Sequence, residues 1–121
     1  MTISEVSEKY GLTPDTLRYY ERIGLIPPVP RTKSGLRDYD ESSCNWIEFI
    51  KCMRGAGLKI EALIEYVALY QQGDSTIEAR KNLLIEQRKD LLEKQTEIAA
   101  TIDRLNYKID NYEKICAKVI K

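Results

Sequence analysis

The chain opens with apolar residues at helical spacing. Within segment 3–10 they recur on one face of a helix, and Thr2 and Glu5 stand at the positions of a capping box. Gly11 then breaks the pattern. These positions predict a short helix that ends before Gly11.

A second helix is framed by stronger signals. Thr13 is a good N-cap, Pro14 suits the first helical position, and Gly24 can take the left-handed conformation that ends a helix. These signals predict a helix from Pro14 to about Ile23. Two short helices joined by a glycine-containing turn are typical of a helix-turn-helix, although helical hairpins in proteins that bind no DNA use similar turns.

The second helix combines a buried side with an exposed polar side. Leu17 lies at helical spacing from Tyr20 or Glu21, and the ring of Tyr20 fits either the core or the edge of the exposed surface. An exposed helix with arginine, tyrosine and threonine suits a phosphate backbone and a DNA groove. The candidate DNA contacts here are Thr16, Arg18, Tyr19, Tyr20 and Arg22.

Residues 25–40 replace the helical pattern with three prolines and a glycine. The prolines exclude a helix, and residues 33–35 can form a turn between two short extended segments. We predict a small hairpin wing on the flank of a DNA duplex. Its candidate phosphate contacts are Arg31, Lys33, Arg37 and the hydroxyl of Tyr39. The alternative is a proline-rich connector with a solvated cluster of charges.

Two further helices are predicted behind the first pair. One begins after the N-cap Asp40 and spans residues 41–54, and the other spans 60–72 before Gly73. Their buried stripes comprise Trp46, Ile47, Ile50 and Met53, then Leu63, Ile64 and Val67 with Leu69 or Tyr70. This second helix pair would complete one small hydrophobic core, so we assign residues 1–73 to one domain.

Residues 74–121 contain neither glycine nor proline and predict one long helix, with Ser75 and Glu78 as its capping box. Apolar residues recur there every seven positions, namely Leu84, Leu91, Ile98, Leu105, Tyr112 and Val119, and the later heptads add Ile102, Ile109 and Cys116. A lone helix of roughly 65 Å cannot bury this stripe on its own domain. We therefore predict a homodimer through a coiled coil, with residues 74–121 as the dimerisation helix.

Charge changes this picture only locally. The 121 residues carry a formal net charge of zero, yet residues 16–37 hold five basic residues against the single acid Glu21. Such a basic cluster is what phosphate neutralisation requires. The chain has no long apolar run and no basic segment followed by an apolar one, so we expect neither a membrane span nor a signal peptide and place the protein in the cytoplasm.

Cysteine and histidine usage narrows the possible chemistry. The chain contains three cysteines, Cys44, Cys52 and Cys116, without CxxC spacing, and it contains no histidine. This composition argues against a disulfide framework and a structural zinc site. It also removes most acid–base and nucleophile–base constellations, so we expect no enzyme activity, no cofactor and no metal.

The segments DTLRYYERIGLIPP and SGLRDY, followed by a helix pair and a long heptad helix, resemble the MerR family of transcription regulators. The matching stretch covers residues 1–72, and the architecture covers the whole chain. The resemblance implies a mainly α fold: an N-terminal winged helix-turn-helix with a second helix pair, followed by a long C-terminal helix that forms an antiparallel coiled-coil dimer.

The resemblance also implies a mechanism and its residues. Family members bind a palindromic promoter whose spacer is too long for RNA polymerase, and an effector makes them untwist and bend the DNA, which is indirect readout. The positions that match family DNA contacts are Arg18, Tyr19, Tyr20, Arg37 and Tyr39. Antiparallel pairing would place Cys116 opposite the partner's N-terminal heptads, which argues against a disulfide between two copies of Cys116.

The effector is expected at Cys52. This residue lies about 160° around the helix from Ile50, away from the apolar stripe, and Lys51 and Arg54 nearby favour the reactive thiolate. Its position resembles the single cysteine of the aldehyde- and electrophile-responsive branch of the family (the AdhR and NmlR types). We hypothesise that an aldehyde or a similar electrophile modifies Cys52. The alternatives are a small residue that fills a helix interface, and a response at Cys44, which lies near a helix N-terminus.

Two classes of function remain at this point. The first is a dimeric DNA-binding regulator, which responds to an electrophile or to another effector. The second is a coiled-coil interaction or scaffolding protein whose basic domain is incidental. The recognition residues favour the regulator.

Overall fold

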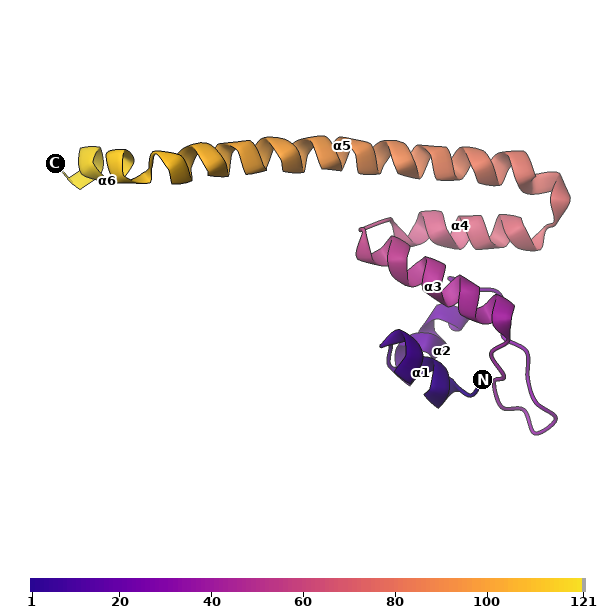
Figure 1. Ribbon diagram of the computed structural model, residues 1–121. Coiled ribbons are helices and arrows are strands. Elements are labelled where there is room, and N and C mark those ends of the chain that lie inside the picture. The colour runs from indigo at the N-terminus through magenta and orange to yellow at the C-terminus, as the bar shows by residue number, and fades with distance from the viewer. Residues whose placement is uncertain (121) are drawn as a thin grey trace. The chain divides into compact units, whose positions relative to one another are not determined.

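The structure is a computed structural model that describes residues 1–120, with side chains described as far as residue 117. Its elements in chain order are α1 (Ile3–Tyr10), α2 (Pro14–Arg22), α3 (Glu41–Gly55), α4 (Ile60–Gln71), a 3-10 turn (Asp74–Thr76), α5 (Ile77–Asp110) and α6 (Tyr112–Ile120). They divide into two compact units, Met1–Gln87 and Arg88–Lys121. The described residues contain no regular strand, and the prediction of a mainly α fold is confirmed (Figure 1).

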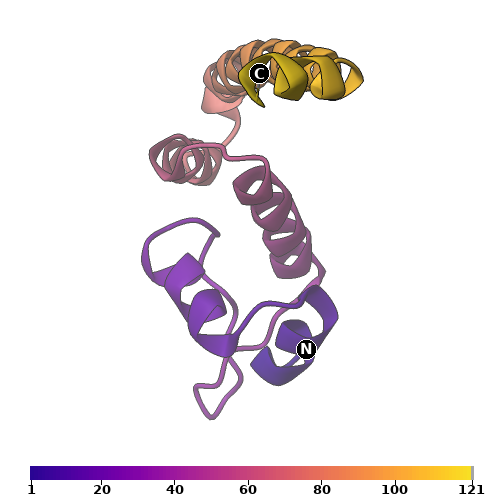
Figure 2. The same ribbon diagram turned by 90° about the vertical axis from the view of Figure 1, so that its left-hand side faces the viewer.

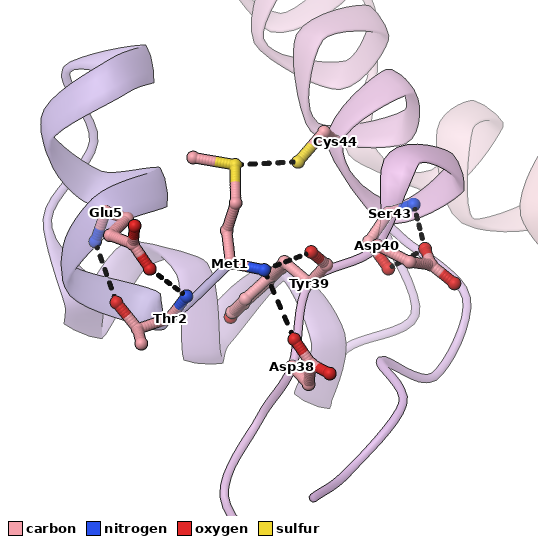
Figure 3. Close-up of polar contacts among 8 residues, drawn as sticks. All are labelled: Met1, Thr2, Glu5, Asp38, Tyr39, Asp40, Ser43 and Cys44. Atoms are coloured by element: carbon pink, nitrogen blue, oxygen red, sulfur yellow. Dashed lines mark hydrogen bonds and ion pairs between the residues drawn. The ribbon is translucent and has the colours of Figure 1, made fainter.

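The first two helices form where their caps are satisfied. The Thr2 hydroxyl accepts a hydrogen bond from the Glu5 amide at 3.2 Å, while the Thr2 amide donates to the Glu5 carboxylate at 2.8 Å (Figure 3). The Thr13 hydroxyl accepts from the Thr16 amide at 3.1 Å. Between the helices, Gly11 has a φ of 66°, a left-handed conformation that favours glycine. The predicted helix-turn-helix is confirmed.

The core of the first unit draws on almost every segment of its length. The helices contribute Val6, Leu17, Ile47, Ile50, Leu63 and Val67, each at most 2% exposed. The proline-rich segment that follows α2 adds Leu25, Ile26, Val29 and Tyr39, each at most 4% exposed. Segment 25–40 is therefore part of the core as well as the carrier of the wing.

The wing is a tight loop closed by a single antiparallel bridge between Arg31 and Arg37. Within it, the Thr32 amide donates to the Leu36 carbonyl at 2.8 Å. Gly35 sits at a φ of 87° at the turn, which a residue with a side chain rarely adopts. Figures 1 and 2 show this loop projecting from the first unit at the end opposite α4. The predicted hairpin is present, without regular strands.

The second helix pair departs from the prediction at Trp46. Asp40 caps α3 as expected, because its carboxylate accepts from the Ser43 amide at 2.8 Å. Trp46 was expected in the buried stripe but is only half-buried. Its ring packs at the surface against Tyr70, with ring centroids 4.9 Å apart, and against Tyr66 at 5.8 Å. The reason is that aromatic rings of α4 lie on that side of α3.

The long helix begins later than predicted. A capping box at Ser75 and Glu78 was expected, but α5 begins only at Ile77. The hydroxyl of Thr76 lies 2.6 Å from the Leu69 carbonyl oxygen, which ties residues 74–76 into a 3-10 turn against the end of α4. The first unit consequently takes in the first turns of α5.

The long helix is not continuous, contrary to the prediction. A turn at Asn111 separates α5 from α6. The side-chain amide of Asn111 donates to the Tyr107 carbonyl at 2.9 Å. The backbone amide of Asn111 donates to the same carbonyl at 3.1 Å, so the Tyr107 carbonyl accepts two hydrogen bonds where the helix is interrupted. Neither glycine nor proline stands at this position.

The heptad stripe divides by exposure along α5 and into α6. Leu84 and Leu91 are half-buried. Further along, five stripe residues are between 50% and 67% exposed in the single chain, namely Ile98, Ile102, Leu105, Ile109 and Tyr112. Cys116 is half-buried, and Val119 lies outside the residues whose side chains are described. Among the described residues no helix has the length and hydropathy needed to cross a membrane.

Candidate nucleic-acid interface

The exposed side of α2 carries the residues expected there. Arg18 and Arg22 are exposed, Tyr19 is 39% exposed, and Thr16 is half-buried. Arg18 forms an ion pair with Asp15 at 2.9 Å, and the Arg22 guanidinium lies 5.5 Å from the centroid of the Tyr19 ring. Both arginines are thus held by neighbours one turn or less away along the same helix.

The wing and α2 meet at one hollow of about 230 Å³. Arg18 of α2 and Arg31 and Arg37 of the wing all line it, together with Thr2 and Ile3 from the start of α1. Three arginines from two segments therefore line a single surface, next to the acidic Asp38. Such a cluster suits the phosphate oxygens of a nucleic-acid backbone.

Glu21 lies at the base of this cluster and was not among the expected site residues. Its carboxylate accepts hydrogen bonds from the Arg37 Nε and from the Val29 amide, both at 2.7 Å. Arg31 Nη2 lies 3.6 Å away, and the Glu21 side chain is only 12% exposed. Burial would raise the pKa of Glu21, but the Val29 amide and the two arginines outweigh it and hold the pKa below its ordinary value.

Two of the three tyrosines expected to contact DNA, Tyr20 on α2 and Tyr39 after the wing, are core residues in this structure. Tyr20 is 8% exposed and Tyr39 is 1% exposed, and burial raises the pKa of both. The Tyr39 hydroxyl is buried without a hydrogen-bond partner in the described structure. A phosphate contact by either hydroxyl stays a prediction. Lys33, in contrast, is exposed at the tip of the wing.

The N-terminal amine braces the end of the wing segment. It donates to the Tyr39 carbonyl at 2.7 Å and to the Asp38 carboxylate at 3.2 Å, as Figure 3 shows. The Met1 sulfur lies 3.9 Å from the Cys44 Sγ. The first residue of the sequence, the wing and the start of α3 are thereby joined beside the interface.

The three cysteines differ in accessibility. Cys52 is exposed, as expected, while Cys44 is 7% exposed and Cys116 is half-buried. The cations next to Cys52 are engaged with backbone, since Lys51 donates to the Tyr10 carbonyl and Arg54 donates to the Leu58 carbonyl at 2.6 Å. Among the described residues, no group of three or more histidine, cysteine or acidic residues could hold a metal ion.

Comparisons with known proteins identify the family of the chain. Residues 1–69 match the model of the MerR HTH family regulatory protein, and residues 45–107 match a second model described as MerR, DNA binding. Among curated relatives, the HTH-type transcriptional regulator AdhR of Bacillus subtilis is 63% identical over 93 residues. That match covers 77% of this chain and 66% of AdhR, just under two thirds of its length.

Two solved structures extend the likeness to the long helix. A crystal structure described as a putative MerR family transcriptional regulator from Listeria monocytogenes is 50% identical, with a TM-score of 0.91 and coverage of 93% of this chain and 86% of the other. HiNmlR, a MerR family regulator lacking the sensor domain and bound to promoter DNA, is 30% identical, with a TM-score of 0.84 and coverage of 96% and 92%. The chain therefore belongs to the MerR family of helix-turn-helix regulatory proteins, on its AdhR- and NmlR-like branch.

Proposed function

We propose that the protein is a dimeric regulator that binds a palindromic promoter with an over-long spacer and activates transcription by distorting the DNA. The convergence of Arg18, Arg31 and Arg37 on one hollow is the observation that carries this proposal. A spacer that must be untwisted and bent is read through its deformability, which requires firm hold of the backbone more than many base contacts. RNA polymerase at the same promoter, in the cytoplasm, is the second partner.

The proposed DNA contacts follow from exposure and charge. They are Thr16, Arg18, Tyr19 and Arg22 on α2, and Arg31, Lys33 and Arg37 on the wing. Tyr20 and Tyr39 are kept as proposed contacts at the edge of this set. For Tyr39 the support is its match to a family DNA-contacting position, since its hydroxyl is buried and a phosphate would reach it only if the side chain moved.

A second copy of the chain would complete the molecule. The seam that we assign to the dimer consists of Leu84, Leu91, Ile98, Ile102, Leu105, Ile109 and Tyr112. Its later members are at least half exposed in the single chain, and a heptad stripe in water is stabilised by a partner helix. Antiparallel pairing would let the two reading helices face the two half-sites of a palindrome.

We propose that an aldehyde or a similar electrophile is sensed at Cys52. The thiol is exposed, whereas the rival Cys44 is buried beneath Met1. Cys52 also has a route to the DNA-binding helices, because its neighbour Lys51 donates to the carbonyl of Tyr10, the last residue of α1. A group added at Cys52 would lie one residue from Lys51 and could disturb its hydrogen bond to Tyr10. The likeness to AdhR adds support.

The test is transcription in vitro from the promoter beside the protein's own gene, with and without formaldehyde. Wild type and Cys116→Ser, the matched control, are expected to activate when the aldehyde is added, and Cys52→Ser is not. An undiminished response in Cys52→Ser would refute the sensing role. Binding without any response would leave a regulator with another effector, and the absence of a sequence-specific complex would favour the scaffolding function.

A further inference from the structure

We propose that Glu21 is a positioning residue for DNA binding, whose carboxylate holds Arg31 and Arg37 of the wing in register with Arg18 on α2. The inference rests on the proposed interface and assigns a role to a residue that the family resemblance did not bring to notice. It is unexpected on charge alone, because Glu21 is the only acid among residues 16–37 and carries the sign that repels phosphate.

Three contacts of the Glu21 carboxylate link α2 to the wing segment. Glu21 belongs to α2, and one of its oxygens accepts from the Val29 amide while the other accepts from Arg37 Nε, both at 2.7 Å. The carboxylate therefore joins α2 to the backbone at Val29, just before the wing, and to the side chain of Arg37, at the end of the wing. Arg31, which bridges to Arg37 across the wing, lies 3.6 Å from the same carboxylate.

Two effects of this carboxylate on DNA binding oppose each other. Its charge weakens the positive potential that attracts phosphate, whereas its hydrogen bonds hold arginines that would otherwise lose rotamer freedom on binding. Burial decides in favour of positioning. Glu21 is 12% exposed, and its charge is already compensated by Arg37 and Arg31, so little of it acts on a phosphate outside.

Asp15 supplies a matched contrast on the same helix. It also pairs with an arginine of the interface, at 2.9 Å from Arg18, but its side chain is 95% exposed and joins no other segment. An exposed pair of this kind holds its arginine weakly, because solvent and salt screen it. Asp15→Asn and Glu21→Gln thus remove the same charge from the same helix. Only Glu21→Gln also removes the proposed positioning contact.

The test measures the affinity of the full-length protein for the DNA fragment upstream of its own gene at several salt concentrations. Glu21→Gln is expected to bind about tenfold more weakly and to lower the salt slope by about one for each phosphate that the displaced arginines no longer neutralise. Asp15→Asn is expected to bind as tightly as wild type or more tightly. Equal or tighter binding by Glu21→Gln would show that the carboxylate merely competes with phosphate, and would overturn the proposal.

A double-mutant cycle separates positioning from general damage to the fold. In an Arg37→Ala background, Glu21→Gln should cost little further affinity, since it acts through the arginine already removed, whereas fully additive losses would overturn the proposal. Glu21→Asp, which keeps the charge, should recover part of the affinity. Hydrogen exchange of the Val29 amide should become faster in Glu21→Gln. This measurement tests the Glu21–Val29 hydrogen bond without DNA. Failure of the wild type to bind the fragment would instead count against the proposed function.

Discussion

Residues 1–87 and 88–117 use their apolar side chains in opposite ways. In the first unit the side chains of Leu17, Ile47 and Ile50 are fully buried against neighbours from the same chain. In the second, Ile98 and Leu105 are 60% and 54% exposed although they recur with equal regularity. Helical periodicity therefore identifies the face that must be covered, but only the three-dimensional structure tells whether this chain covers it.

The contrast extends to what each unit can do alone. A unit with its own core can hold Arg18, Arg31 and Arg37 in place without a partner. An isolated helix has little stability in water unless its apolar stripe is packed. In the proposed regulator, the first unit binds one half-site of the DNA. The second unit determines whether two such units bind as a dimer.

The largest effect is expected from charge placed on the exposed seam. The double variant Ile98→Asp, Ile102→Asp is expected to weaken the proposed dimer about a hundredfold or more, because it buries two carboxylates at the seam. Sedimentation velocity across a concentration series measures this. Ala100→Asp, which places a charge on the opposite face of α5, is the control. A wild-type chain that stays monomeric at all concentrations would contradict the proposed dimer.

Truncation inside the first core should act on folding instead. Ile47→Ala is expected to lower the free energy of unfolding by about 2–5 kcal/mol, because a fully buried side chain leaves a cavity. Leu36→Ala, at a site 68% exposed, should change it by less than about 0.5 kcal/mol. Urea titrations followed by circular dichroism compare the two. Similar losses at both positions would show that the core is placed wrongly.

Acid is expected to weaken the contact between Glu21 of α2 and the wing. The pKa of Glu21 is lowered in the folded state, so its contribution is present above its unfolded pKa and is lost as the pH falls through the folded value. At pH 7, Glu21→Gln is expected to cost about 1–3 kcal/mol of unfolding free energy. The gap between wild type and variant should close as the pH falls through the folded-state pKa of Glu21. A gap that stays constant with pH would exclude the ionised carboxylate as its cause.

The smallest effect is expected from one atom in the first core. Tyr39→Phe removes a buried hydroxyl that has no partner, so the unfolding free energy should stay unchanged or rise by up to about 1 kcal/mol. If the hydroxyl contacts a phosphate, DNA affinity should fall about threefold to tenfold at the same time. Thermal unfolding measures the stability of the variant, and a DNA titration of the same preparation measures its affinity. Unchanged affinity would assign Tyr39 to the core alone.

Much of the fold was predictable because its signals are local. The N-caps Thr2, Thr13 and Asp40 each bond to an amide three residues later, and such pairs are visible in the sequence. The misplaced boundaries have causes of another kind. The Thr76 hydroxyl bonds back to the Leu69 carbonyl, and the long helix is interrupted at Asn111 without glycine or proline; neither feature follows from periodicity.

The candidate site was predictable only in its charged residues. Basic residues on α2 and the wing stand out in the sequence, but Glu21 and Arg37 are 16 positions apart and their pairing depends on the fold of the proline-rich segment between them. The spacing of Glu21 from Leu17 suggested a side facing inward, and no local signal named its partner. Tyr39 followed the wing in sequence, yet its ring turns into the core.

The aromatic cluster between α3 and α4 also gives the protein a built-in optical reporter. Trp46 is the only tryptophan in the sequence, so fluorescence excited at long wavelength comes from this one indole. Its ring lies 4.9 Å from Tyr70 and 6.2 Å from Phe49, on the helix that carries Cys52. Any shift of α3 against α4 changes the polarity around the indole. If the proposed modification of Cys52 shifts α3 against α4, emission from the unlabelled protein would report it in solution and without DNA.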